Sequence, residues 1–473
     1  MSAIPSTREV RTSSSLESGT KWIAVIVMGV LSLWLATGRT WSLNFFLEGQ
    51  EFNASFFNAQ SVALLDGRLD VPSANFAWTE CFIVDGRCFG YFGVTPSLLR
   101  IPLVALGGSS APYFIPVSIA LAVGLSTWAI LDLFQRLVHH LIPESSARDL
   151  PIMAGTISLF VLLGPGSILT FLSKPRVYHE ASLWMIAFLL VAMNLVYRWL
   201  FDRRIGLLLI AGIAAVLSAN ARPSGATSAL ILGLGVVTVL VADRRARKPR
   251  RSELALASGL AILPALTSTG VLWLKFGTAS LPWEKYNLYE SEGYRRLSDL
   301  NGGQLQGIRF IPTNLINYLR PDSVRFSISA PYVIEQVPST NPAITLWPID
   351  RNGMFVESFV SLTNAMPLSL LLSVGIVVAV LMGRVKMSRI ERQSFGILFL
   401  ASAAATVVVL TSVALTTRYL GDFFPLMAIG SIYAIAHLLT WLRGRPRAVL
   451  VVTALLVFVS LGNLFVQLQL TTS

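Results

Sequence analysis

Three short clusters of charged residues stand directly beside long apolar stretches, at residues 48–51, 174–180 and 417–422. Arg222 stands in a similar position, in a short turn between two apolar stretches. Charges at such boundaries cost free energy unless they are paired or hydrated, so they mark candidate functional residues. Carboxylates act as general bases or as ligands for hard cations, and Arg and Lys hold phosphate. Together the clusters predict a site that transfers a group from a phosphate-linked donor.

Within these clusters, Glu51 is the candidate general base, and Glu48 and Glu180 are the other candidate catalytic carboxylates. Arg176 and Glu180 are four residues apart, which is also the spacing of an ion pair on one helix face. A catalytic role for Glu180 and an ion pair with Arg176 both stay open. For the single His179, a structural hydrogen bond is a better explanation than catalysis. No cluster of His and Cys predicts zinc or haem, and the metal requirement is unknown, with a divalent cation as the one candidate cofactor. The candidate substrate-binding residues are Lys174, Arg176, Tyr178, His179, Arg222, Arg418 and Tyr419.

Eleven apolar stretches must position these clusters. A chain of 473 residues with 54% hydrophobic and 13% charged residues does not have the composition of a soluble protein. A spanning helix needs roughly 20 apolar residues, and it satisfies its backbone hydrogen bonds internally. We therefore predict an all-α polytopic membrane protein with about 11 transmembrane helices. The predicted spans are residues 22–38, 113–134, 151–172, 181–199, 205–219, 226–241, 254–274, 367–382, 395–413, 423–442 and 449–466. The fifth and sixth spans meet at a tight turn, so whether they cross fully is left open.

The distribution of Lys and Arg predicts the direction of the chain. With a cytoplasmic N-terminus, the inner segments hold 21 of the 37 basic residues and nine acids, and this difference equals the whole net charge of +12. The basic character is therefore topological. Because it is spread over six short segments beside membrane spans, we expect no nucleic-acid partner. Eleven spans then place the C-terminus outside a bacterial plasma membrane.

Two large loops, residues 39–112 and 275–366, fall on the outer side in this topology. Residues 1–20 are polar and predict a disordered cytoplasmic tail, so residues 21–473 form one integral membrane domain with these two outer loops. Every inner loop is short, and no Gly-rich loop for a nucleotide is present. Chemistry is therefore expected at the outer face, on a substrate that is already activated on a lipid or arrives through the membrane.

The first outer loop contains a predicted β-hairpin. Asp85-Gly86 is a strong two-residue turn signal between apolar strands, and this turn places Ile83 opposite Cys88 with Cys81 diagonal to Cys88 on the same face. Cys81 and Cys88 are the two cysteines of the chain. Both a disulfide in an oxidising compartment and two half-buried thiols fit this placement, and two cysteines alone do not predict a metal site.

The segment of residues 95–103 that follows the hairpin is amphipathic and too short to span a bilayer. It predicts a helix at the membrane interface or a re-entrant segment, which would shape a groove for a lipid tail. The second outer loop alternates aromatic and polar residues. Such rings stack on sugars and also pack at the headgroup level without any further role.

In their order along the chain, these motifs resemble the GT-C class of membrane glycosyltransferases, in particular its glycosyltransferase-39-like (RgtA/B/C/D-like) group. That class has an acidic motif after the first span, matched here by Gln50-Glu51, although the family position usually contains Asp; Glu48 stands close enough to share the role. In that class the acidic motif is followed by a helix with Ala and Leu, a turn with aromatics, a charged loop and a late Arg-Tyr before Pro. They are matched by residues 59–68, 85–99 and 174–180 and by Arg418-Tyr419 with Pro425.

The resemblance implies two outer loops over a cavity at the membrane surface, a polyprenyl-phosphate-linked sugar donor and an inverting transfer. The expected acceptor is an envelope glycan, lipid or protein, and membrane lipids surround the chain. In this hypothesis Glu51 is the base, and Arg418, Arg222 and Lys174 hold the lipid phosphate. The alternatives are a lipid or polysaccharide transporter (flippase) without chemistry and a scaffold of an envelope assembly machine. Buried charges near the bilayer midplane would favour transport, whereas the charged clusters of this chain lie at one surface.

Overall fold

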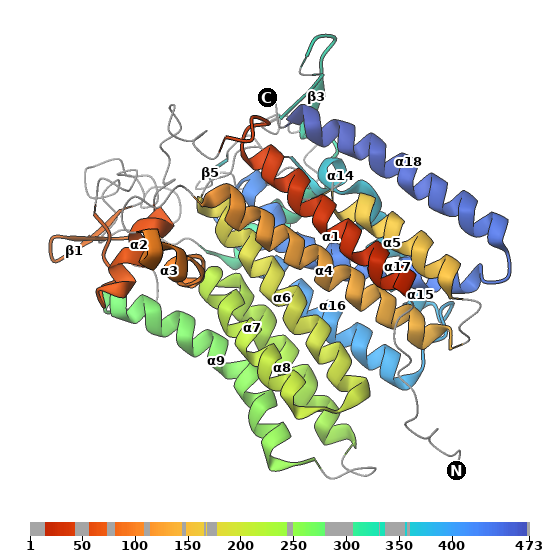
Figure 1. The fold of residues 1–473 in the computed structure, drawn as a ribbon, viewed down its shortest axis with the longest axis horizontal. Coiled ribbons are helices and arrows are strands. Elements are labelled where there is room, and N and C mark those ends of the chain that lie inside the picture. Colours follow the sequence, from red (N-terminus) through yellow and green to blue (C-terminus); the bar gives the residue numbers. More distant parts are fainter. Residues whose placement is uncertain are drawn as a thin grey trace.

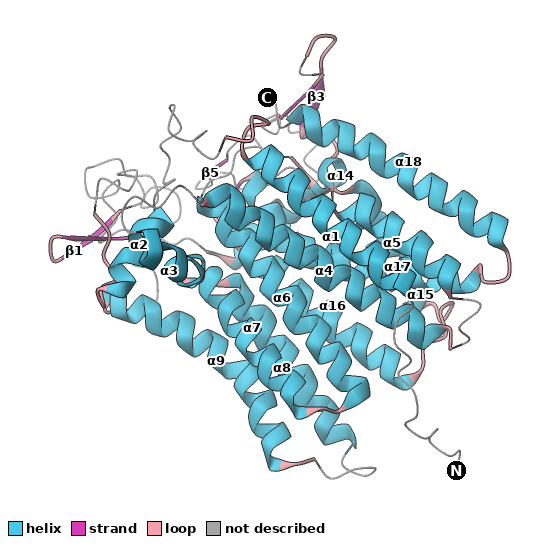
Figure 2. Cartoon of the chain, in the orientation of Figure 1, coloured by secondary structure: helices cyan, strands magenta, loops and turns pink. Residues whose placement is uncertain are grey.

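The protein is a bundle of long helices with small elements at one end (Figure 1). The structure, a computed structural model, describes residues 15–42, 56–72, 81–107, 114–143, 148–164, 167, 177–243, 249–279, 306–330, 332–335, 355–356 and 360–470. Within these residues helices dominate, and the strands are short and paired in twos (Figure 2). The predicted class of polytopic helical membrane protein is confirmed.

Among the described residues, eight helices are long and apolar enough to cross a bilayer. They are α1 (Ser15–Ala36), α4 (Ile115–Leu141), α6 (Val177–Asp202), α8 (Ser224–Ala242), α9 (Arg251–Phe276), α16 (Arg389–Leu410), α17 (Leu420–Trp441) and α18 (Pro446–Leu470). Three shorter apolar helices are α5 (Asp149–Leu163), α7 (Ile205–Ala221) and α15 (Pro367–Leu381). Each predicted span thus overlaps one helix. At about 1.5 Å per residue, helices as short as these three are shorter than the roughly 30 Å of a hydrocarbon core. The count of eleven crossings therefore stays a prediction.

The boundaries of several helices differ from the predicted ones. The third span was expected to continue to residue 172, but α5 ends at Leu163 and its cap is Gly164, whose N–H donates to the Phe160 carbonyl at 3.0 Å. Pro165 and Gly166 follow in the sequence, and proline cannot continue the helical hydrogen-bond ladder. Helix α6 begins four residues before the predicted start at 181, and α1 begins at Ser15, inside the predicted tail.

The bundle has central helices and a lipid-facing outer layer. In the most apolar stretch of α6, 83% of the residues are buried, and in those of α4 and α17 the share is 72% each. The share of buried residues is only 28% for α1 and 22% for both α9 and α18. Their exposed side chains include Ile262 and Leu266 of α9 and Phe458 of α18. Such apolar surfaces are expected to face lipid. Helix α6 therefore lies at the centre of the bundle, and its first turn supports the site described below.

The first outer loop contains two helices and a hairpin. Helices α2 (Phe56–Leu65) and α3 (Thr95–Gly107) flank the antiparallel strands β1 (Phe82–Val84) and β2 (Arg87–Phe89). Ile83 pairs with Cys88, so the predicted register is confirmed. Asp85 and Gly86 both have positive φ, at 49° and 74°, as a type I′ turn requires. The predicted amphipathic segment is the helix α3, which is shorter than a membrane span.

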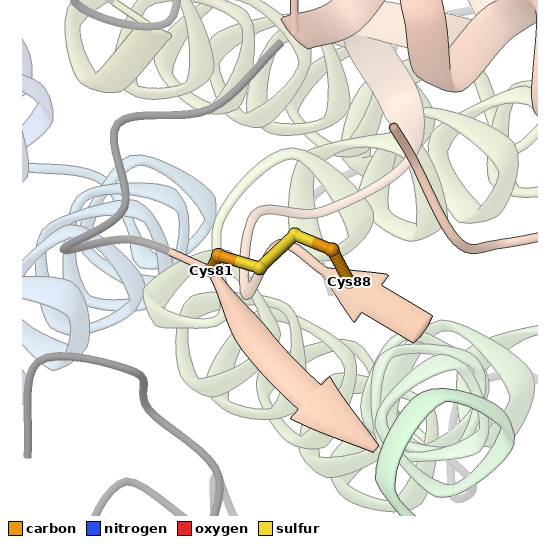
Figure 3. The surroundings of a disulfide bond; sticks show 2 residues. All are labelled: Cys81 and Cys88. Atoms are coloured by element: carbon orange, nitrogen blue, oxygen red, sulfur yellow. A yellow bond between two sulfur atoms is a disulfide. The ribbon is translucent and has the colours of Figure 1, made fainter. Parts of the chain in front are cut away.

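A disulfide joins Cys81 and Cys88 across the hairpin (Figure 3). The other face of the hairpin packs on the end of α9, because the rings of Phe82 and Phe89 lie 5.4 Å and 6.1 Å from that of Phe276. Both cysteines belong to a separate apolar cluster with side chains of α2 and of the first turn of α6. The hairpin therefore connects the first outer loop to two helices of the bundle.

The second outer loop has small elements that the sequence patterns did not predict. They include the 3-10 turn η8 (Ile308–Phe310), α13 (Ile311–Leu319), the antiparallel pair β3 (Val324–Phe326) and β4 (Val333–Glu335), β5 (Phe355–Val356) and the short α14 (Leu362–Ala365). Strand β5 pairs in parallel with β6 (Ala414–Leu415), which lies between α16 and α17. This pairing brings the second outer loop to the segment that carries Arg418.

Candidate functional site

Four of the predicted site residues lie outside the described part of the chain. Glu48 and Glu51 fall within residues 43–55, and Lys174 and Arg176 fall within residues 171–176. The described predicted residues are Tyr178, His179, Glu180, Arg222, Arg418 and Tyr419. They come from the start of α6, the end of α7 and the 3-10 turn η9 (Thr417–Tyr419) that precedes α17.

Two arginines and two tyrosines from these three places form a continuous row. The Arg418 guanidinium carbon lies 4.4 Å from the centroid of the Tyr178 ring and 5.7 Å from that of Tyr419. The Arg222 guanidinium carbon also lies near this second ring, 5.3 Å from the Tyr419 centroid. A cation over an aromatic face is attracted by the ring quadrupole. The structure therefore brings together residues that are far apart in the sequence, and we call these four residues the arginine–tyrosine row.

The row ends on a buried ion pair that sequence reasoning did not identify. Nη2 of Arg222 lies 2.9 Å from Oδ2 of Asp422, whose side chain is fully buried. Asp422 also accepts a hydrogen bond from the hydroxyl of Ser224, and Nη1 of Arg222 donates to that of Ser182. These contacts join α6, α7, α8 and α17 at the same end of the bundle. Asp422 belongs to the predicted cluster of residues 417–422, but its partner lies on another helix, which spacing along the chain does not indicate.

The second outer loop fixes the segment that carries Arg418. Nδ2 of Asn314, on α13, donates to the carbonyls of Leu410 and Ser412 at 2.8 Å each. The Tyr318 hydroxyl donates to the Thr416 carbonyl at 3.3 Å. With the β5–β6 pairing, these bonds hold the backbone between α16 and α17 at several points before Arg418. The position of the guanidinium is therefore set by the loop as well as by the bundle.

The first outer loop approaches the row through residues 90–95. Lys275, at the end of α9, is buried, and its Nζ donates to the carbonyls of Gly90 at 2.9 Å and Phe92 at 2.8 Å. The Phe92 ring packs edge-on against that of Tyr178, with centroids 5.3 Å apart. Thr95 Oγ1 donates to the Leu217 carbonyl of α7 at 2.7 Å. Tyr178 thus lies between the first outer loop and Arg418.

Glu180 has a partner that the sequence did not indicate, while Arg176, its candidate partner by spacing, lies outside the described residues. Its side chain is fully buried, and both carboxylate oxygens lie 2.6 Å from Nη2 of Arg100 on α3. Ser118, on α4, donates a further hydrogen bond to Glu180. Sequence reasoning missed Arg100, although a lone arginine in the amphipathic segment of residues 95–103 was a signal for a buried partner. The neighbouring His179 is half-buried.

Metal-ligating side chains do not gather in the described residues, where no group of three or more His, Cys, Asp or Glu could hold an ion. The site offers guanidinium groups, tyrosine rings and serine hydroxyls, which suit the binding of an anion such as phosphate. The acidic residues of the first outer loop at positions 48 and 51 lie outside the described residues.

No protein-family profile and no curated protein matches this sequence. Solved structures do match, among them the oligosaccharyltransferase of Archaeoglobus fulgidus in its apo form, with a TM-score of 0.50 and 15% identity over 97% of this chain and 57% of that one. The oligosaccharyltransferase AglB of the same organism, in complex with an inhibitory peptide and a dolichol-phosphate, matches with a TM-score of 0.50 and 13% identity over 96% of this chain and 56% of that one. The A. fulgidus enzyme tethered by a disulfide to an acceptor peptide with the NVT sequon gives a TM-score of 0.50 and 13% identity, with 97% and 56% of the two chains covered.

This likeness shows a shared fold. The present chain spans a little more than half the length of those enzymes. Its membrane bundle has the GT-C-like architecture that the order of sequence motifs predicted.

Proposed function

We propose that this protein is a membrane glycosyltransferase that moves a sugar from a polyprenyl-phosphate-linked donor to an envelope acceptor at the outer face of the plasma membrane. The observation that carries the proposal is the arginine–tyrosine row, where Arg418 and Arg222 converge at the outer end of the bundle. Cations fixed at that depth suit the phosphate of a lipid whose chain stays in the bilayer. The fold shared with an enzyme that was solved with a dolichol-phosphate supports a lipid-linked donor.

The two arginines have different parts in this proposal. Arg418 is half-exposed and lies over two tyrosine rings, so its guanidinium is the main contact for the donor phosphate. Arg222 already faces Asp422, which compensates much of its charge, and its side chain is 17% exposed. It therefore holds Tyr419, and through it Arg418, and adds a weaker attraction for phosphate. Lys174 and Arg176 stand just before α6 in the sequence and are further candidates for the same anion.

The proposed chemistry is a single displacement with inversion. The acceptor hydroxyl oxygen attacks the anomeric carbon, its proton goes to the Glu51 carboxylate, and the bond from the anomeric carbon to the phosphate oxygen breaks. The leaving group is the polyprenyl phosphate, whose negative charge Arg418 stabilises. The tyrosine rings beside Arg418 offer faces on which a sugar stacks. Glu48 is the next candidate for the base.

The test uses purified protein in lipid nanodiscs with the donor identified by mass spectrometry of lipid-linked sugars in a deletion strain. We expect Glu51→Gln to lower kcat by about 10²- to 10⁴-fold, because loss of a general base typically has that effect. Arg418→Ala should mainly raise the KM for the donor. Asp66→Asn and Arg325→Ala serve as controls, because both positions are exposed in the outer loops.

The outcomes separate the alternatives. A wild-type rate for Glu51→Gln shows that Glu51 is not the base and moves the test to Glu48. Wild-type protein that translocates lipid-linked glycan without any transfer is a transporter. Parallel assays with EDTA and with added Mg²⁺ or Mn²⁺ test the divalent cation, because carboxylates such as Glu48 and Glu51 are also ligands for such ions.

A further inference from the structure

A buried charge cluster that the proposed mechanism does not use lies beside the arginine–tyrosine row. The side chains of Arg100 and Glu180 are 3% and 0% exposed. Nη2 of Arg100 lies 2.6 Å from both Glu180 oxygens, and Nη1 donates to Oδ1 of Asn58 at 2.7 Å. Ser118 donates to Glu180 and accepts from Nε1 of Trp184 at 2.8 Å. The cluster thus ties α2 and α3 of the first outer loop to α4 and α6 of the bundle.

The burial of this pair has a physical consequence. Two charges removed from water carry a desolvation penalty, which only close geometry and further hydrogen bonds offset. An apolar pair of similar volume often gives equal or greater stability. What the ion pair adds is geometry, because a planar guanidinium that contacts both carboxylate oxygens fixes distance and orientation together. The pair therefore suits a role in placing the first outer loop more than a role in stability alone.

The same cluster is close to the arginine–tyrosine row. Tyr178 lies two residues before Glu180 in the first turn of α6, and its ring stands between Phe92 of the first outer loop and Arg418. Phe57 of α2 packs in one apolar cluster with Val177 and Tyr178. The Arg100 guanidinium carbon lies 5.6 Å from the centroid of the Phe57 ring. A displacement of α3 relative to α6 would therefore change the packing around Tyr178 and Arg418.

We infer that Arg100 and Glu180 are positioning residues, which lock the first outer loop to the first turn of α6 and so set the geometry between that loop and the Tyr178–Arg418 contact. This reassigns Glu180 from the candidate catalytic carboxylates. The inference deepens the proposed function and rests on it where turnover is concerned. The mechanical coupling itself does not depend on turnover, and it is measured separately.

The test compares the double variant Arg100→Met/Glu180→Leu with the wild-type protein in three measurements. The unfolding temperature in detergent should return to about that of the wild type, because no charge is left unpaired, whereas each single substitution should lower it. Hydrogen exchange should rise at residues 90–95 and 417–422. The kcat of transfer should fall by about 10- to 100-fold, since small misplacements of reacting groups have effects of that size.

Two further variants keep the inference falsifiable. Arg100→Lys retains the charge but not the planar fork, and should reproduce the fall in kcat with an unfolding temperature closer to the wild-type one even if the double variant does not fold. Lys21→Met removes an ion pair with Asp132, at the opposite end of the bundle. It should leave both hydrogen exchange at residues 417–422 and kcat unchanged.

The outcomes are distinct. Unchanged hydrogen exchange at residues 417–422 in the double variant or in Arg100→Lys would overturn the coupling, whatever the activity. Wild-type kcat in a variant with raised exchange would show that the pair is structural only. Raised exchange in a protein whose wild-type form transfers no sugar would support the coupling and contradict the proposed function.

Discussion

Buried charge at the outer ends of the helices is compensated at short range by side chains or carbonyls of neighbouring helices. Asp422 faces Arg222, Glu180 faces Arg100, and Lys275 donates to two backbone carbonyls. Such groups are expensive near a membrane unless they are satisfied. Each of these contacts therefore fixes the relative position of the elements that it joins. The loss of a single partner should lower the stability of the whole bundle.

We expect Asp422→Ala to destabilise the protein strongly. The substitution leaves the Arg222 guanidinium without its carboxylate, and removal of one partner of a buried pair typically costs about 3–5 kcal/mol. The unfolding temperature in detergent measures this effect. The control is Asp66→Ala, which removes one partner of an exposed pair whose side chains are 46% and 56% exposed. It should not shift the unfolding temperature. Equal behaviour of the two variants would contradict the assigned burial of Asp422.

The backbone contact at Gly93 leads to a second expectation at the residue scale. A Cβ atom at this position would lie 1.9 Å from the carbonyl oxygen of Asn220, two residues before Arg222. Gly93→Ala must therefore push the first outer loop away from the end of α7 and lower the unfolding temperature. The control is Gly212→Ala in α7, where a Cβ meets no heavy atom within 4 Å and alanine is the better helix former. An unfolding temperature of Gly93→Ala equal to that of the control would show that the loop does not dock there.

At the scale of the element, the β1–β2 hairpin combines a turn, an apolar face and a disulfide. Its Phe82 and Phe89 side chains pack on Phe276, while Cys81 and Cys88 face the cluster around Phe56. The turn residues have the positive φ values that close a two-residue loop. The hairpin therefore has a defined position even before the covalent bond is considered.

We expect the disulfide between Cys81 and Cys88 to add about 2–3 kcal/mol at most, because the closed loop is short. In intact membranes without reductant, neither cysteine should react with a membrane-impermeant maleimide. Reduction followed by denaturation should make both thiols reactive, because both side chains are buried in the folded protein, and reduction alone should lower the unfolding temperature only modestly. Free labelling of both thiols before reduction would exclude the disulfide.

At the scale of the whole molecule, different charged residues gather at the two ends of the bundle. At one end Asp132 contacts Lys21 and Arg136, at 2.8 Å and 2.6 Å, and Asp243 contacts Arg203 and Arg389 at 2.8 Å and 3.1 Å. The row and both outer loops lie at the other end. Helix α1 begins at the opposite end of the bundle from that where α18 ends (Figure 1). This agrees with an odd number of crossings and with the predicted placement of the termini.

Reporter fusions test this orientation. An insertion at Arg247, in a basic loop, should report the cytoplasm, and one at Ser298, in the second outer loop, should report the outside. The reverse result would place the arginine–tyrosine row at the cytoplasmic face and would exclude a reaction at the outer surface. Two insertions on the same side would mean that α9, the predicted span between them, does not cross.

The sequence by itself determined the class of the protein, the helices of the bundle, the position of the two large loops along the chain and the register of the hairpin. These follow from local signals: apolar length, the distribution of Lys and Arg, and a two-residue turn. The same signals marked Tyr178, Arg222, Arg418 and Tyr419 as residues at one boundary of the membrane. A boundary position depends on the distance along a single helix, which the sequence contains.

Only the tertiary structure decided which charges meet. Glu180 faces Arg100, 80 positions away in the chain, a contact that its spacing from Arg176 did not indicate, and Arg176 itself lies outside the described residues. Arg222 was expected to hold phosphate, and the structure shows in addition that it faces Asp422 on another helix. Contacts of this kind depend on which helices are neighbours and on how each is rotated about its axis. The packing of the whole bundle fixes both, whereas hydrophobic periodicity in a helix that is apolar on all sides indicates neither.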